Sequence, residues 1–251
     1  MVKSDKKEVL MPIPVNRIIE KLDGYLSHND TRAAEDLLLY WENEALKEGD
    51  NRGLLSVLNE QIGFYRRNRD IEKGQRAIST ALNLMKDEEP SFAVIYVNIA
   101  TTVKSYGDDR LALEYFNRAK RLFEKYEMTE NYEYAAFLNN LGTCLSDLGR
   151  FKEACDSFDE AVDVLKKRGC GNCQIAVSYV NKAHVLDRSG EKDGIEGLLD
   201  LAWEELNNEP FPRGGEYAFA VSKCAPSFEY FGRVTEAKAL MEVADEIYQG
   251  S

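Results

Sequence analysis

The sequence predicts an all-α solenoid of about six helix-turn-helix repeats. A small or aliphatic residue recurs along the chain, followed by an apolar residue four places later and by another small or apolar residue three places after that. Six sets have this spacing: Ala34/Leu38/Trp41, Gly74/Ile78/Ala81, Ala112/Phe116/Ala119, Ala154/Phe158/Ala161, Ile195/Leu199/Ala202 and Ala237/Met241/Ala244. A glycine precedes each of the last four sets by five places: Gly107, Gly149, Gly190 and Gly232. Because the apolar spacing between these marks is helical, the regularity indicates a helical repeat array.

Turn-forming stretches and prolines divide the chain into its expected elements. We expect a short N-terminal tail and an array over residues 15–249, in which each repeat is a helix, a short turn and a second helix. The expected segments are 1–14 for the tail and 15–50, 51–89, 90–129, 130–169, 172–209 and 214–249 for the repeats. Pro90, Pro210 and Pro212 mark repeat boundaries, because a helix cannot continue through the residues that precede them.

The fourth repeat shows why small residues recur. Gly149 lies where its first helix must stop, and glycine adopts the left-handed conformation of a helix end without strain. Gly142 and Ala154 allow the two helices to approach closely, while Phe158 fills the space between repeats. The second repeat has Arg69 in place of the turn glycine.

Composition argues against several classes of partner. The chain has 44 acidic and 32 basic residues, with a formal charge of −12, which repels phosphate backbones and anionic lipid heads. Neither nucleic acid nor a membrane is therefore expected as a partner. The first fourteen residues lack the apolar core of a signal peptide, and the five cysteines fit reduced thiols, so we expect a cytoplasmic protein.

The fourth repeat carries a recognisable motif. The string Leu138-Asn139-Asn140-Leu141-Gly142, followed by Leu145, Gly149, Phe151, Ala154, Phe158 and Ala161, resembles the tetratricopeptide repeat. With a period near 42 residues, the array is most similar to the longer repeats of kinesin light chains and their bacterial relatives. The resemblance implies a right-handed superhelix whose first helices line a concave groove.

Asparagines recur on the helix face that this resemblance places in the groove. Asn98, Asn140 and Asn181 each stand two places before a small residue, and the sixth repeat has Lys223 there. Residues three and seven places further on share the same face. The predicted peptide-binding residues are Asn98, Thr101, Asn140, Thr143, Asn181, His184, Arg188 and Lys223.

Two interpretations of the asparagines remain open. An amide both donates and accepts, so a row of asparagines suits an extended peptide backbone of any sequence, and the resemblance implies such a contact. Arg188 and Lys223 would then receive a carboxylate. Alternatively, the asparagines bond to the neighbouring helix and only hold the stack together.

Other polar features favour ordinary structural roles. Cys170 and Cys173 form one pair where a structural zinc site needs four ligands, so we expect loop thiols, with a redox or metal-sensing loop as alternatives. Arg66, Arg67 and Arg69 are interpreted as a solvated helix end, although Arg66 and Arg67 would also extend the groove for an acidic ligand. Pro226 is expected to bend the first helix of the last repeat.

The sequence therefore favours a protein-interaction module that binds a peptide or protein segment in its groove. No catalytic constellation, metal site or cofactor motif is recognisable, because the chain has two scattered histidines and no phosphate-binding loop, so we expect no enzymatic activity. Two alternatives remain: a sensor of a short signalling peptide, and a structural protein that forms a homodimer through its apolar C-terminal helix. The sequence does not identify the ligand.

Overall fold

The computed structural model describes residues 12–169, 171–209 and 213–249, at residues 248 and 249 for the backbone alone. Within these ranges the chain forms twelve α-helices, and the predicted all-α helical-repeat fold is confirmed. The α-carbon contacts divide the chain into two compact units, residues 1–107 and 108–251. The boundary falls in the turn between the two helices predicted for the third repeat.

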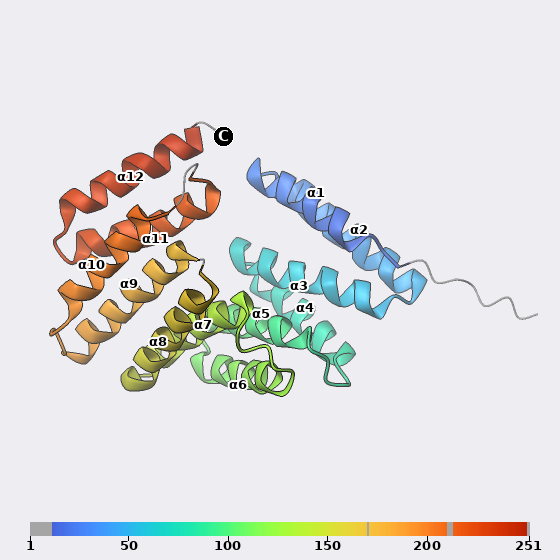
Figure 1. The fold of residues 1–251 in the computed structure, drawn as a ribbon. Helices are drawn as coiled ribbons and strands as arrows, with labels where there is room; N and C mark the ends of the chain where they lie inside the picture. The colour runs from blue at the N-terminus through green and yellow to red at the C-terminus, as the bar shows by residue number, and fades with distance from the viewer. Residues whose placement is uncertain (1–11, 170, 210–212, 250–251) are drawn as a thin grey trace, which may run out of the picture. The chain divides into compact units, whose positions relative to one another are not determined.

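The first unit contains five helices (Figure 1). They are α1 (Val15–Ser27), α2 (Thr31–Glu48), α3 (Asn51–Asn68), α4 (Ile71–Leu84) and α5 (Phe92–Ser105). Neighbours in sequence pack together, α1 against α2 and α3 against α4, and α5 packs against α3. The first helix of one predicted repeat therefore lies beside the first helix of the next.

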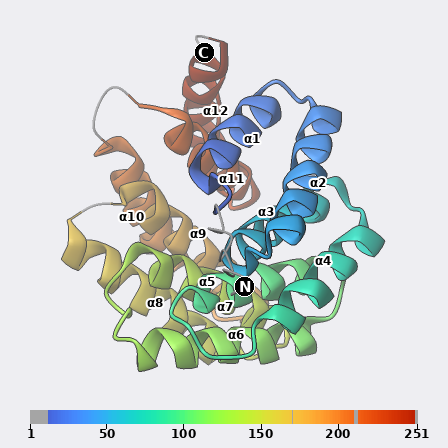
Figure 2. The same cartoon turned by 90° about the vertical axis from the view of Figure 1, so that its right-hand side faces the viewer.

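The second unit repeats this arrangement with seven helices (Figures 1 and 2). They are α6 (Asp109–Lys125), α7 (Tyr132–Asp147), α8 (Phe151–Arg168), α9 (Asn172–Ser189), α10 (Ile195–Asn207), α11 (Gly215–Tyr230) and α12 (Val234–Gln249). The pairs are α7 with α8, α9 with α10, and α11 with α12. In addition, α9 contacts α7 and α11 contacts α9, so the first helices α7, α9 and α11 follow one another through the unit.

Aspartates begin several of these helices. The side chains of Asp30, Asp70 and Asp108 accept hydrogen bonds from the backbone N–H groups three residues later, at 3.0, 3.1 and 3.0 Å. Each bond satisfies one of the donors that a helix N-terminus leaves unpaired, and the carboxylate charge favours the positive end of the helix dipole. The recurring turns thus fix where the second helices α2, α4 and α6 begin.

The turn residues between the two helices of each repeat have left-handed backbone conformations. Gly107, Gly149, Gly190 and Gly232 have φ values of 94°, 75°, 83° and 86°, which confirms the geometric role predicted for them. Asn29 and Arg69 occupy the equivalent positions of the first two repeats with φ values of 55° and 57°. Arg69 therefore adopts the conformation of a turn glycine, and its side chain makes that conformation strained.

Close packing of helix pairs explains the small residues, as predicted. Ala154 and Phe158 of α8 are buried, and a β-carbon added at Gly142 of α7 would lie 2.7 Å from the Phe158 ring. Rings of Phe116, Phe123, Tyr134 and Phe137 join α6 to α7, with centroids 5.3 to 6.2 Å apart. Within the described residues, no helix combines the length and the hydropathy needed to cross a membrane.

Part of the apolar face of the last helix, α12, is buried. Ala237, Leu240 and Ala244 are buried, whereas Val234 and Met241 remain 42% and 41% exposed. The apolar surface of α12 is thus partly covered by its own helix pair, because α12 packs along α11. Tyr248 belongs to the C-terminal helix that was expected to be apolar, and its side chain lies outside the described residues. Pro226 lies inside α11, as predicted.

Candidate functional site

The three asparagines of the predicted ladder have different surroundings. Asn98 in α5 is tied to α3, since its amide nitrogen donates to the backbone oxygen of Asn59 at 2.8 Å and to the Asn59 side chain at 3.1 Å. Its amide oxygen accepts from Arg66 Nη1 at 2.8 Å. Both ends of the Asn98 amide are therefore used within the first unit, as the alternative of a purely structural role requires.

Asn140 and Asn181 lie in the second unit, on α7 and α9. The Asn140 amide nitrogen donates to the carbonyl of Ala136 in its own helix at 2.9 Å. Asn181 is half-buried, and its amide makes no hydrogen bond with any described residue. These two side chains thus differ from Asn98, because neither connects one helix to another. A different pair does so: Ser178 Oγ of α9 donates to Asn139 Oδ1 of α7 at 3.0 Å.

Two predicted threonines make only local hydrogen bonds. Thr101 Oγ1 donates to the carbonyl of Val97 at 2.8 Å, and Thr143 Oγ1 donates to the carbonyl of Asn140 at 2.8 Å. Each hydroxyl keeps an accepting lone pair for another group. Both threonines are half-buried on first helices.

His184 is held between helices of the second unit. Its Nε2 shares a 2.8 Å hydrogen bond with Ser227 Oγ of α11, and its ring lies 4.9 Å from the ring of Phe231 and 5.3 Å from that of Tyr230. Burial lowers the pKa of His184 below its ordinary value, and Arg188 acts in the same direction, while Asp187 opposes them. The neutral imidazole is therefore the form that this packing favours.

The two predicted cations differ in how far they are engaged. Arg188 Nη1 of α9 donates to Ser146 Oγ at 2.9 Å and pairs with Asp147 Oδ1 at 2.7 Å, both from α7. Lys223 of α11 is exposed and lies over the ring of Phe219 at 5.3 Å, and that ring is itself 61% exposed. Lys223 thus offers its charge to an incoming anion more readily than Arg188 does.

Arg66 connects α3 to α5, which corrects its interpretation as a solvated helix end. Its Nη1 donates to Asn98 Oδ1 and to Thr102 Oγ1, at 2.8 and 3.2 Å, and burial lowers its pKa. The repeat period was the signal that could have revealed such partners. Ser146 and Arg188 are 42 residues apart, and His184 and Ser227 are 43 apart, about one repeat in each case.

The cysteine loop does not have the chemistry of a reactive thiol at Cys173. Cys173 lies in the first turn of α9 and is 3% exposed, and burial raises its pKa to about 12. Desolvation of the thiolate therefore favours the expected ordinary thiol at Cys173 over the redox alternative. Cys170, the other member of the pair, lies outside the described residues. Among the residues described, no three His, Cys, Asp or Glu side chains gather as a metal site would require.

Comparison with known proteins supports the predicted family. A model of the tetratricopeptide repeat matches residues 135–164, which span most of α7 and α8. Residues 135–164 are thus a tetratricopeptide repeat, within a chain whose helix pairs form the tetratricopeptide-repeat fold. In sequence it matches none of the curated proteins with which it was compared.

Solved structures show the same tetratricopeptide-repeat fold at low identity. BtubC (BKLC) from P. vanneervenii is 16% identical, with a TM-score of 0.61 over 95% of this chain and 92% of BtubC. A putative kinesin light chain with nearly identical repeats, from Podosopora anserina, is 16% identical, with a TM-score of 0.58 over 77% of this chain and 94% of its own. YrrB, described as a tetratricopeptide-repeat protein with an unusual peptide-binding site, is 17% identical, with a TM-score of 0.51 over 80% and 89%. The predicted likeness to kinesin light chains is confirmed at the level of the fold.

Proposed function

We propose that this tetratricopeptide-repeat protein is a non-catalytic interaction module that binds an extended peptide segment along the first helices α7, α9 and α11 of its second unit. The observation that carries the proposal is the half-buried amide of Asn181, which has no hydrogen-bond partner among the described residues. The donors and the acceptor of this amide remain available to a ligand, and a peptide backbone, which both donates and accepts, can satisfy them.

Neighbouring groups extend this surface in both directions. The amide oxygen of Asn140 on α7 accepts no bond from a described residue, and Thr143 keeps an acceptor beside it. On α11, the exposed ammonium of Lys223 is placed to receive a carboxylate of the ligand. YrrB supports the proposal as a tetratricopeptide-repeat protein with a peptide-binding site.

Asn98 has a different role in this proposal. Its amide holds α5 to α3 through Asn59 and Arg66, so we assign it to the scaffold of the first unit. The Thr101 hydroxyl donates to its own helix, and no specific contact favours a role for Thr101 in ligand binding. The proposed peptide contacts are therefore fewer than the sequence pattern indicates.

The histidines support a role without catalysis. His28 Nδ1 lies 2.8 Å from the carbonyl of Gly24, at the end of its own helix, and His184 is packed among aromatic rings. Ser27 Oγ lies 3.1 Å from His28 Nδ1 but donates to the Gly24 carbonyl, and Ser227, the hydrogen-bond partner of His184, is buried between two helices, so neither serine is held as a nucleophile.

A random peptide display library selected on the full chain tests the proposal. Individual selected peptides are then titrated by fluorescence anisotropy against wild type, the Asn140→Ala/Asn181→Ala variant and Asn98→Ala. We expect about tenfold or greater loss of affinity in the double variant, because each lost amide contact contributes about 1 kcal/mol. Asn98→Ala is the matched control: it should lower the melting temperature and leave the affinity of the folded protein unchanged.

Two outcomes contradict the proposal. One is a library from which no peptide is enriched over a column without protein. The other is a selected peptide that binds wild type and the double variant equally, since the asparagines would then have no part in recognition. Light scattering on the same samples measures self-association independently of peptide binding.

A further inference from the structure

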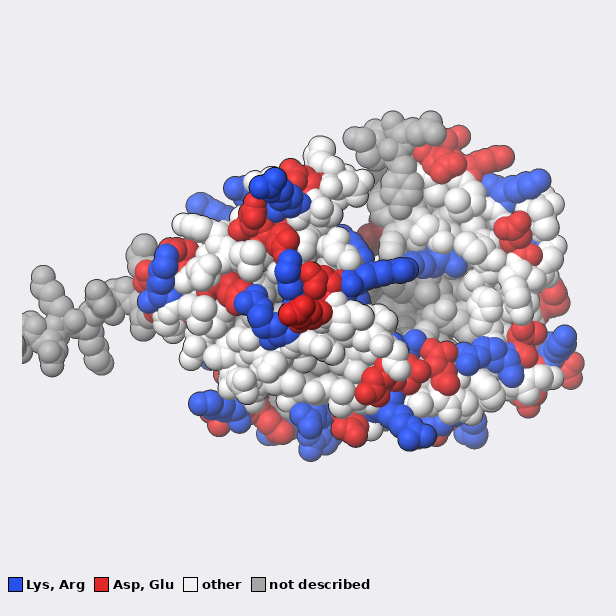
Figure 3. All heavy atoms as spheres, turned by 180° about the vertical axis from the view of Figure 1, so that it is seen from behind, with Lys and Arg blue, Asp and Glu red and all other residues white. Residues whose placement is uncertain are grey.

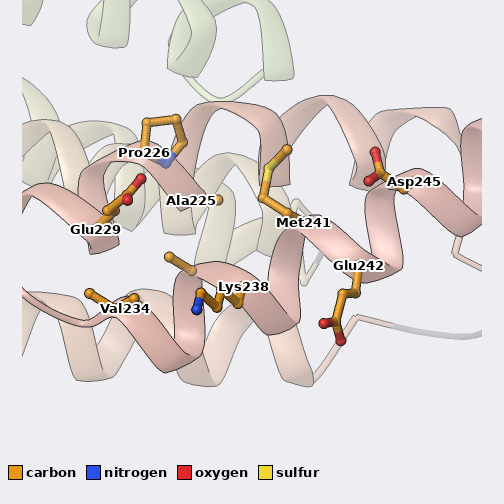
Figure 4. Close-up of a pocket in the computed structure, with 9 residues that line it drawn as sticks. Ala225, Pro226, Glu229, Val234, Lys238, Met241, Glu242 and Asp245 are labelled. Carbon is orange, nitrogen blue, oxygen red and sulfur yellow. The ribbon is translucent and has the colours of Figure 1, made fainter.

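The last helix pair forms a groove of its own. The hollow between α11 and α12 has a volume of about 340 Å³ (Figure 4). It is lined by Ala225, Pro226 and Glu229 of α11 and by Val234, Ala237, Lys238, Met241, Glu242 and Asp245 of α12. Apolar carbon at Val234 and Met241 is exposed there, beside four charged side chains. Asn140, Asn181 and Lys223 are not among the residues that line this α11–α12 groove.

Earlier repeats show what lies against the equivalent surface. In three earlier repeats, the residue three places before the turn residue contacts the first helix of the next repeat. Arg66 donates to Asn98 Oδ1 of α5 at 2.8 Å. Ser146 accepts from Arg188 of α9 at 2.9 Å, and Asp187 accepts from the Tyr230 hydroxyl of α11 at 2.8 Å. The equivalent residue of the last repeat is Glu229, whose carboxylate has no partner among the described residues.

A second position repeats this pattern. Ten places after the turn glycine, Asp159 pairs with Lys182 of α9 at 2.7 Å, and Asp200 pairs with Arg233 at 2.7 Å. The equivalent residue in the last pair is Glu242, and no described residue pairs with it. Glu229 and Glu242 thus occupy two positions at which earlier repeats are contacted by the repeat that follows them.

The charges around the groove indicate what kind of partner it would bind. Glu229, Glu242 and Asp245 outnumber Lys238, and the side chains that pair with Asp159 and Asp200 in the covered grooves are cations. A second copy of this chain docking through α11 and α12 would bring the same three carboxylates against these three. Like charges facing each other disfavour that contact.

We propose that the α11–α12 groove binds an amphipathic helix of another protein, in the place that the first helix of a following repeat would take. The apolar stripe of that helix covers Met241 and Val234, and its lysine or arginine side chains face Glu229 and Glu242. Helix-in-groove binding of this kind takes its affinity from apolar anchors, and the flanking charges determine which helix is accepted. The proposal is independent of peptide binding to Asn140 and Asn181.

The test uses a helix that already makes these contacts elsewhere in the molecule. The probe is a fluorescein-labelled peptide with the sequence of α9, residues 172–189, with Cys173→Ser, because α9 carries Lys182 and Arg188. Fluorescence anisotropy against the full chain should show saturable binding. Glu229→Lys/Glu242→Lys should weaken it about tenfold or more, and a peptide with Lys182→Glu and Arg188→Glu should regain affinity for that variant.

The matched control changes the net charge equally at a distance from the groove. Glu191→Lys/Asp193→Lys alters two exposed residues in the turn between α9 and α10 and should leave the affinity within about twofold of wild type. Absence of saturable binding, or equal affinity of wild type and Glu229→Lys/Glu242→Lys, would overturn the proposal. A wild-type dimer in sedimentation equilibrium that Met241→Asp dissociates would also overturn it, because a second copy would then occupy the groove.

Discussion

The ring of Phe158 in α8 lies against the backbone of Gly142 in α7. A β-carbon built on Gly142 would lie 2.7 Å from Phe158 Cζ and 2.8 Å from Cε1, closer than carbon atoms pack. Phe158 is 1% exposed and is enclosed by the helices around it, so the ring has no solvent-filled space into which it can turn. The approach of α7 to α8 therefore requires glycine at this position.

Gly142→Ala should lower the free energy of unfolding by about 1–3 kcal/mol, because the added methyl group overpacks the helix interface. Urea denaturation at constant pH measures the change. Gly197→Ala in α10 is the matched control, since no other heavy atom would lie within 4 Å of its added β-carbon. That substitution should instead stabilise the protein by about 0.5–1 kcal/mol. Equal effects of the two substitutions would contradict the packing argument.

Steric requirements of this kind explain how much of the fold the sequence predicts. A glycine at a left-handed turn or under a buried ring recurs with the repeat period, because every repeat has the same turn and the same helix packing. Gly107, Gly149 and Gly190 therefore predicted where first helices end, and Gly142 and Ala154 predicted where two helices meet. These features depend on residues near in sequence, which a periodic pattern records directly.

The candidate site was less predictable because its chemistry depends on neighbouring helices. Asn98, Asn140 and Asn181 are equivalent in sequence, yet Asn98 meets Arg66 and Asn59, whereas Asn181 meets no described partner. The sequence shows an amide at each position without showing what lies opposite it. The same reason explains Cys173, whose burial depends on packing that the cysteine spacing does not reveal.

Arg69→Gly should stabilise the protein. Arg69 has a left-handed backbone, with φ at 57°, at the place where later repeats have glycine. A side chain in this conformation costs about 1–2 kcal/mol, although the greater freedom of glycine in the unfolded chain offsets part of the gain. We expect a net increase of about 0.5–1 kcal/mol in the free energy of unfolding, measured with urea. Gly149→Arg, the reverse change at the equivalent turn, should destabilise; a gain there would refute the argument.

Native Cys173 should resist alkylation. Burial raises its pKa to about 12, so at pH 8 the thiolate fraction is roughly a thousandfold below that of an ordinary cysteine. Iodoacetamide labelling followed by peptide mass spectrometry should leave Cys173 unmodified in the folded protein and modify it in guanidinium chloride. Rapid labelling of the native chain would show instead that the N-terminus of α9 opens.

His184 should make stability depend on pH near neutrality. Burial lowers its pKa in the folded state, so the unfolded chain, with an ordinary value of 6.5, binds the proton first as the pH falls. Stability from the neutral ring is then fully present above about pH 6.5 and is lost as the pH falls from there through the lower folded-state pKa. Acidification favours unfolding because the charged ring is poorly solvated beside Phe231.

His184→Gln isolates this contribution, since glutamine keeps a polar group within reach of Ser227 but does not titrate. Urea denaturation of both proteins between pH 7.5 and 5.0 gives the difference in their free energies of unfolding. Carboxylates elsewhere in the chain titrate in both proteins and cancel in that difference. We expect wild type to lose stability relative to His184→Gln as the pH falls below about 6.5. A difference that does not change with pH would mean that His184 binds its proton equally well in the folded and unfolded states. Burial between α9 and α11 would then not destabilise the protonated ring.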